Sequence, residues 1–165
     1  MAPLDWWVDG AGHTLTFCCV DTPSRQFAKL GLLFMRGGEW DGQRIISEEW
    51  VRESTTSRAS GNPGYAYQWW LAEEDDRLPK DSFMALGLDN QQLYVIPSLD
   101  LIAVRNGTYT KPPGEAVAPE GFLKKFGPRG TKEHGTLAPE LDWSHDIFLS
   151  HVINSIEGAD RVDLP

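Results

Sequence analysis

Residues 82–105 contain three short runs of strand-forming residues, and no other stretch constrains the fold as strongly. The runs cover residues 83–86, 91–96 and 101–104, and turn-forming residues lie between them. The second and third runs are almost wholly apolar, a pattern typical of strands whose two faces are both covered. We therefore predict an α+β fold with an antiparallel sheet flanked by helices.

Three helices are expected around this sheet. The first covers about residues 23–36 and ends at Gly37-Gly38. Asp41-Gly42 then predicts a tight hairpin. Ser47 is a typical cap for a second helix, in which we expect Trp50 and Val51 to be buried. A third helix is predicted at about 144–157 from its apolar stripe.

The chain has the length of one domain, 165 residues, and we interpret 1–165 as a single partial domain. Glycine and proline are dense at about 107–141, which predicts a long loop before the terminal helix. Aromatic residues gather at 65–71, where we expect a strand-like segment.

Charge and hydropathy limit the partners. The net charge of −9 disfavours nucleic acid and anionic membranes. No apolar run is long enough to predict a membrane span. The first residues carry no export signal, and the compartment stays open between bacterial cytoplasm and periplasm.

Cys18 and Cys19 are adjacent, and neighbours in a strand point to opposite faces. We therefore expect two buried core residues rather than a mutual disulfide. The four histidines form no zinc-binding pattern with them, so no metal and no other cofactor is predicted.

The usual motifs of nucleophilic catalysis are absent from these 165 residues. No serine has a lysine three positions later, no Tyr-x-Asn occurs, and there is no Gly-x-Ser-x-Gly elbow. We predict no catalytic residue within this sequence.

Several segments, taken in order, nevertheless resemble the C-terminal part of the β-lactamase-related serine hydrolases, and most of all the branch of class C β-lactamases, esterases and aminohexanoate-oligomer hydrolases. The resemblance covers about residues 5–106 and 143–157. The segments that carry it are 17–19, 25–34, 37–42, 46–51, 64–70 and 85–101.

This resemblance implies a β-lactamase/transpeptidase-like fold, an acyl-serine mechanism and a small ester or amide substrate. Ala85-Leu86-Gly87 looks like the family's third motif, on the strand that borders the active site. Leu88 would then supply a backbone N–H to the oxyanion hole, so the substrate-binding residues are Ala85, Leu86, Gly87 and Leu88. Ala85 stands where the family often has Lys or His, which favours a neutral substrate.

The resemblance also implies that the nucleophile, its base, two strands and a helix belong to an N-terminal part that this sequence lacks. We expect this chain to be inactive alone. We also expect 101–104 to have an unpaired edge, which would let it join an N-terminal half or a second copy. Two alternatives stay open: a non-catalytic interaction or ligand-binding module derived from that fold, and an unrelated α+β domain that binds a small ligand through its aromatic residues.

Overall fold

The structure is a computed structural model, and it describes residues 4–57, 63–72, 78–87, 91–106 and 145–156. The chain divides into two compact units, which are described separately. One comprises Met1–Gly87 and Gln91–Arg105, and the other comprises Leu88–Asn90 and Asn106–Pro165.

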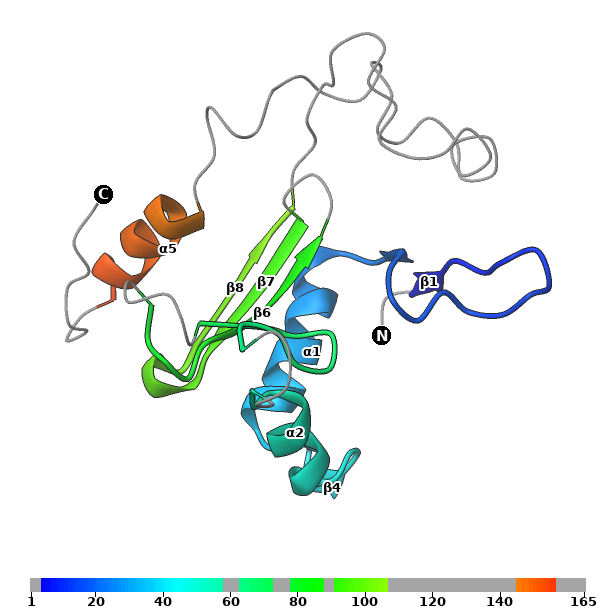
Figure 1. The fold of residues 1–165 in the computed structure, drawn as a ribbon, viewed down its shortest axis with the longest axis horizontal. Helices are drawn as coiled ribbons and strands as arrows, with labels where there is room; N and C mark the ends of the chain where they lie inside the picture. The colour runs from blue at the N-terminus through cyan, green and yellow to red at the C-terminus, as the bar shows by residue number, and fades with distance from the viewer. Residues whose placement is uncertain (1–3, 58–62, 73–77, 88–90, 107–144, 157–165) are drawn as a thin grey trace, which may run out of the picture. The chain divides into compact units, whose positions relative to one another are not determined.

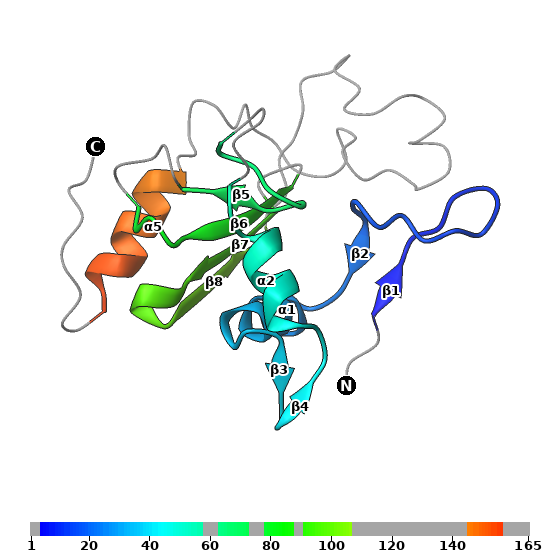
Figure 2. The ribbon, with the colours of Figure 1, turned by 60° about the horizontal axis from the view of Figure 1, so that its bottom comes forward.

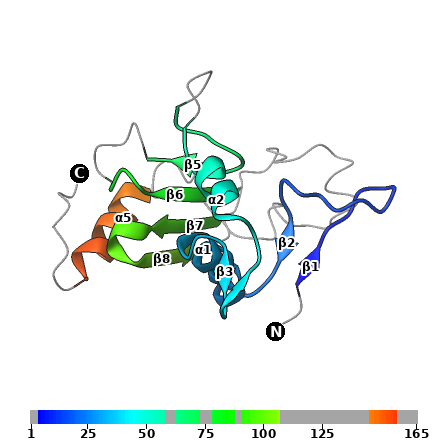
Figure 3. The ribbon, with the colours of Figure 1, turned by 90° about the horizontal axis from the view of Figure 1, so that it is seen from below.

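A four-stranded antiparallel sheet forms the centre of the first unit (Figure 1). Its strands lie side by side in chain order, as Figure 3 shows. This arrangement confirms the α+β class and is compatible with a partial β-lactamase-like fold. The strands are β5 (Trp70–Leu71), β6 (Phe83–Gly87), β7 (Gln91–Ile96) and β8 (Leu101–Arg105).

The two apolar strands differ in burial. In β7, residues 92–96 are all buried, as expected for a strand covered on both faces. Every residue of β8 is only half-buried. Strand β8 is the last strand of the sheet and has one described neighbour, so its outer edge is unpaired within the described residues. Helix α1 (Ser24–Met35) contacts β8 on one face, and the covering of its other face stays a prediction.

Helix α1 lies against one face of the sheet, over β7 and β8 (Figure 2). Gly31 permits this close approach, because a Cβ there would lie 3.0 Å from Val95 Cγ2 and 3.1 Å from Leu93 Cδ1. Phe27, Phe34 and Met35 of α1 pack on the buried cluster beneath it. That cluster consists of Trp69, Leu71, Phe83, Leu93 and Val95.

The predicted end of α1 and the hairpin after it are both present. Gly37 and Gly38 have φ of 61° and 89°, values that L side chains adopt at a cost. The hairpin pairs β3 (Glu39–Trp40) with β4 (Gln43–Arg44). Asp41-Gly42 forms its turn with φ of 49° and 76°, the left-handed pair that such hairpins require.

Helix α2 (Glu48–Ser54) begins where the sequence predicts, because the Ser47 Oγ accepts a hydrogen bond of 3.0 Å from the Trp50 N–H. Val51 is buried as expected, but Trp50 is 44% exposed, so its predicted burial is wrong. A helix of two turns presents only a narrow face to the core, and Val51 and Ser54 occupy it.

The N-terminal segment pairs β1 (Asp5–Trp6) with β2 (Val20–Asp21). Just before β2, a disulfide joins Cys18 to Cys19, so the expectation that these residues stay unbonded in the core is wrong. It assumed an extended strand. Cys19 instead has a left-handed φ of 71°, and both cysteines are half-buried in a turn.

The second unit contains α5 (His145–Asn154), inside the segment predicted as the terminal helix. The predicted loop at 107–141 lies outside the described residues. None of the helices in the described ranges is long and apolar enough to cross a bilayer.

Candidate functional site

The outer side of β6 is paired along only part of its length. On the inner side, all five residues of β6 are in register with β7. On the outer side, β5 matches only two of them, Leu71 with Phe83 and Trp70 with Met84. Residues 85–87 therefore have no neighbouring strand on that side within the described part of the chain.

Two hydrogen bonds fix which peptide groups face this open side. The Ala72 N–H donates to the Ser82 carbonyl at 3.2 Å, whereas the Leu71 N–H donates to Gly64, away from β6, at 2.8 Å. Alternate residues of an antiparallel strand face the same edge. The peptide groups of Ser82, Met84 and Leu86 thus face the side of β6 that is away from β7. Of these, the N–H and C=O of Leu86 meet no described strand.

Three of the four predicted substrate-binding residues, Ala85, Leu86 and Gly87, lie on this strand beyond the end of the pairing with β5. Ala85 and Leu86 are half-buried and Gly87 is exposed, so the end of the strand is accessible. Gly87 also lies close to its partner strand, since a Cβ there would be 3.2 Å from the Gln91 carbonyl oxygen. Leu88, the predicted oxyanion donor, lies outside the described residues, and its role stays a prediction.

Beside the open edge lies an aromatic hairpin, residues 64–71. The Ala66 N–H donates to the Trp69 carbonyl at 2.8 Å, and a bridge pairs Tyr65 with Trp70. Trp69 anchors the hairpin, with its ring centroid 4.8 Å from that of Phe34 and 5.0 Å from that of Phe83. The strand predicted at 65–71 is therefore reduced to Trp70–Leu71, and the residues before it form a tight turn.

The hairpin presents aromatic rings to solvent. Tyr65 contacts Trp70, with centroids 4.9 Å apart, and Tyr67 contacts Trp50 of α2 at 5.1 Å. All four rings are exposed. The sequence indicated an aromatic cluster here, but not which rings face the core and which face solvent.

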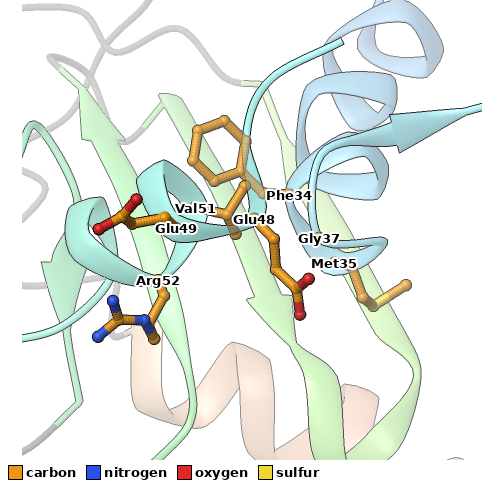
Figure 4. Close-up of a pocket in the computed structure, with 7 residues that line it drawn as sticks. All are labelled: Phe34, Met35, Gly37, Glu48, Glu49, Val51 and Arg52. Atoms are coloured by element: carbon orange, nitrogen blue, oxygen red, sulfur yellow. The ribbon is translucent and has the colours of Figure 1, made fainter. Parts of the chain in front are cut away.

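An open hollow of about 500 Å³ lies elsewhere, between the end of α1 and α2 (Figure 4). Glu48 and Glu49 occupy the first turn of α2, where the helix dipole favours carboxylates. The lining of the hollow includes no serine, cysteine or lysine and no residue of β6, so the hollow does not coincide with the site predicted from sequence. Its lining residues are Phe34, Met35, Gly37, Glu48, Glu49, Val51 and Arg52.

Comparison with known proteins gives distant similarities. No protein-family model matches the chain. Over 117 residues, 64% of this chain and 29% of the other, it is 25% identical to 6-aminohexanoate-dimer hydrolase of Paenarthrobacter ureafaciens. Over 122 residues, 63% of this chain and 34% of the other, it is 29% identical to an uncharacterized protein of Alkalihalophilus pseudofirmus.

The chain thus spans about a third of the length of the curated relatives that it matches. The first relative is a hydrolase by name, so the chain has distant similarity to a hydrolase.

Proposed function

We propose that this chain forms the C-terminal part of a β-lactamase-related serine hydrolase. The complete protein would cleave a neutral ester or amide through an acyl-serine. The serine and its general base come from a part of the protein outside this sequence. The observation that carries the proposal is the open outer edge of β6 beyond Met84, which ends at the exposed Gly87.

The edge can serve the reaction through its backbone. When a serine attacks the substrate carbonyl, negative charge develops on the carbonyl oxygen, and a backbone N–H aimed at that oxygen stabilises it. The peptide group of Leu86 faces the open side, and residues two positions apart on a strand face the same edge. Leu88 is therefore the proposed donor, and its side chain is not needed for the role.

The surroundings of the edge favour a neutral substrate. Ala85 contributes no charge, and the neighbouring hairpin exposes Tyr65, Tyr67 and Trp70. Aromatic rings and small apolar side chains form favourable contacts with uncharged groups, and they offer no counter-ion to a carboxylate. The name of the first relative, a hydrolase of an aminohexanoate dimer, supports an amide among the candidate substrates.

The first test compares this chain with the longest reading frame that contains it, assayed with a chromogenic ester, a chromogenic anilide and a chromogenic β-lactam. We expect the chain alone to be inactive, since loss of a serine nucleophile and its base costs about 10⁶ in rate. The longer protein should turn over the ester or the anilide. Turnover by the chain alone that survives every serine substitution would contradict the mechanism.

The second test addresses Leu88 in the active, longer protein. Leu88→Pro removes the backbone N–H, and we expect kcat to fall by about 10²–10³-fold. Leu88→Ala keeps the N–H and is the matched control, with kcat close to that of the parent. Equal kcat values for the two variants would exclude residue 88 as the oxyanion donor.

A second candidate function rests on the other edge of the sheet. The alternation that directs Leu86 outward also directs Ile102 and Val104 outward from β8, and no described strand pairs with them. Such an edge suits a non-catalytic module that binds a partner by adding a strand. Association of the isolated chain, measured by analytical ultracentrifugation, supports this candidate if the longer protein is also inactive.

A further inference from the structure

We propose that Cys18 and Cys19 form a reversibly reducible site, which opens to a pair of adjacent thiols able to bind a soft, thiophilic ion. The site does not depend on the proposed hydrolase function. It lies in the turn before β2, and all cysteines of the chain are accounted for by this one disulfide.

A role in global stability does not explain this disulfide. A disulfide stabilises a fold mainly by restricting the unfolded chain, and the effect grows with the length of the loop that it closes. Cys18 and Cys19 are neighbours in sequence, so their bond closes almost no loop. Opening it should therefore change the free energy of unfolding little, which leaves reversible chemistry as the more fitting role.

The backbone around the pair is held by contacts that do not involve sulfur. The Trp6 indole Nε1–H donates to the carbonyls of Leu15 at 2.8 Å and Cys18 at 2.9 Å. The Trp7 backbone N–H donates to the Cys19 carbonyl at 3.0 Å. Because these hydrogen bonds are independent of the S–S bond, the two thiols stay close together after reduction.

The site is open to a redox partner. Both cysteines are half-buried, and the preceding Phe17 is 71% exposed. Cys19 also has a left-handed φ of 71°, which is uncommon for a residue with a side chain. Such conformations gather at functional sites.

The reaction balances with an external dithiol as reductant. Its thiolate attacks one sulfur of the Cys18–Cys19 bond, that bond breaks, and a mixed disulfide forms with the protein. The second thiol of the reductant displaces the protein sulfur. Two electrons and two protons pass to the protein, and the reductant leaves as a disulfide. The resulting thiolates are good ligands for soft ions.

The test uses the whole chain and counts thiols by mass spectrometry after iodoacetamide treatment. After oxidised glutathione we expect an unmodified monomer that is lighter by two hydrogen atoms than the reduced protein. After dithiothreitol we expect two alkyl groups. Two reactive thiols that persist through the oxidant, or oxidation only to disulfide-linked dimers, would overturn the proposal.

Phenylarsine oxide then probes the reduced state, with Cys18→Ser and Cys19→Ser as matched controls that keep one thiol each. We expect one arsenic per wild-type chain, and binding weaker by about 10²–10⁴-fold in either variant, because a second attachment point is lost. Reduction should also change the tryptophan fluorescence of the wild type but not of the variants, because the Trp6 indole is held at Cys18 by a hydrogen bond to its carbonyl, and a disulfide quenches indole fluorescence at short range more strongly than thiols do. Equal arsenical affinity in all three proteins would show that the thiols do not act as a pair.

Discussion

Among the described residues, strands β8 and β6 both lack a full partner on their outer sides, but in different ways. On the far side of β8, no described strand lies beside any of its five residues, from Leu101 to Arg105. On the far side of β6, the short strand β5 covers two residues and leaves three open. The first opening is as long as a strand, and the second is a gap of a few residues beside an anchored hairpin.

The side chains at these two openings differ in size. Strand β8 carries bulky apolar residues, including Leu101, Ile102 and Val104, so another strand laid beside it could bury them. Strand β6 ends in Ala85, Leu86 and Gly87, and the two small residues on either side of Leu86 leave room for a ligand to approach the backbone. The difference indicates that the β8 side suits assembly with another strand, whereas the β6 side suits a small molecule.

The largest expected effect tests whether the hairpin beside β6 is anchored by one ring. Trp69→Ala removes a side chain that is 5% exposed and contacts Phe34 and Phe83, and should lower the free energy of unfolding by about 3–5 kcal/mol. Trp70→Ala removes the exposed neighbour and should cost less than about 1 kcal/mol. Urea unfolding measures both. Similar losses in the two variants would mean that the hairpin is not anchored as described.

A pair of proline variants tests the direction of the peptide groups in β8. Ala103 faces β7 opposite the buried Tyr94, so Ala103→Pro should cost about 1–3 kcal/mol by leaving a buried carbonyl unpaired. Val104 faces outward, so Val104→Pro should be the milder change.

Val104→Pro should also abolish any association through this edge, because proline has no N–H to offer an added strand. Sedimentation of both variants, alongside urea unfolding, measures the two effects. A greater loss of stability in Val104→Pro than in Ala103→Pro would reverse the assigned directions.

The smallest expected effect concerns a contact between the segments that lead into β6 and β8. Asp81 lies just before β6, and Ser98 lies just before β8. The Asp81 carboxylate accepts hydrogen bonds from the Ser98 N–H at 2.6 Å and from the Ser98 hydroxyl at 2.9 Å. Both residues are exposed, so Asp81→Asn should cost about 0.5–1.5 kcal/mol. Ser98→Ala removes only the hydroxyl bond and should cost less. Thermal unfolding distinguishes the two, and no loss in either would show that the contact does not join the edges.

Local features were predictable because a few neighbouring residues determine them. Gly37-Gly38 and Asp41-Gly42 adopt left-handed backbone conformations, which glycine accepts because it lacks a Cβ and which aspartate tolerates in turns. Ser47 caps α2 with its own hydroxyl. The three runs between 83 and 105 became strands at nearly the expected bounds, since strand-forming residues alternate there with turn residues.

The candidate site was only partly predictable. The sequence places Ala85, Leu86 and Gly87 on a strand, and the structure brings them to an accessible edge. The open side of that edge follows from where β5 stops pairing, which depends on the turn at residues 65–70 and has no signal in β6 itself. The exposure of Trp50 and the Cys18–Cys19 bond were also missed. The sequence did not show that α2 buries only Val51 and Ser54, or that the backbone at Cys19 is left-handed rather than extended.

The sequence alone determined the turns, the helix cap and the succession of strands, because each of these depends on backbone preferences and hydrogen bonds within a few residues. Only the tertiary structure decided that Trp69 enters the core while Trp70 stays outside, and that Leu86 faces the open edge. Both outcomes depend on strand register, and a shift of one residue would reverse every direction along the strand. Register is set by packing against α1 and the neighbouring strands, which brings together residues far apart in the chain.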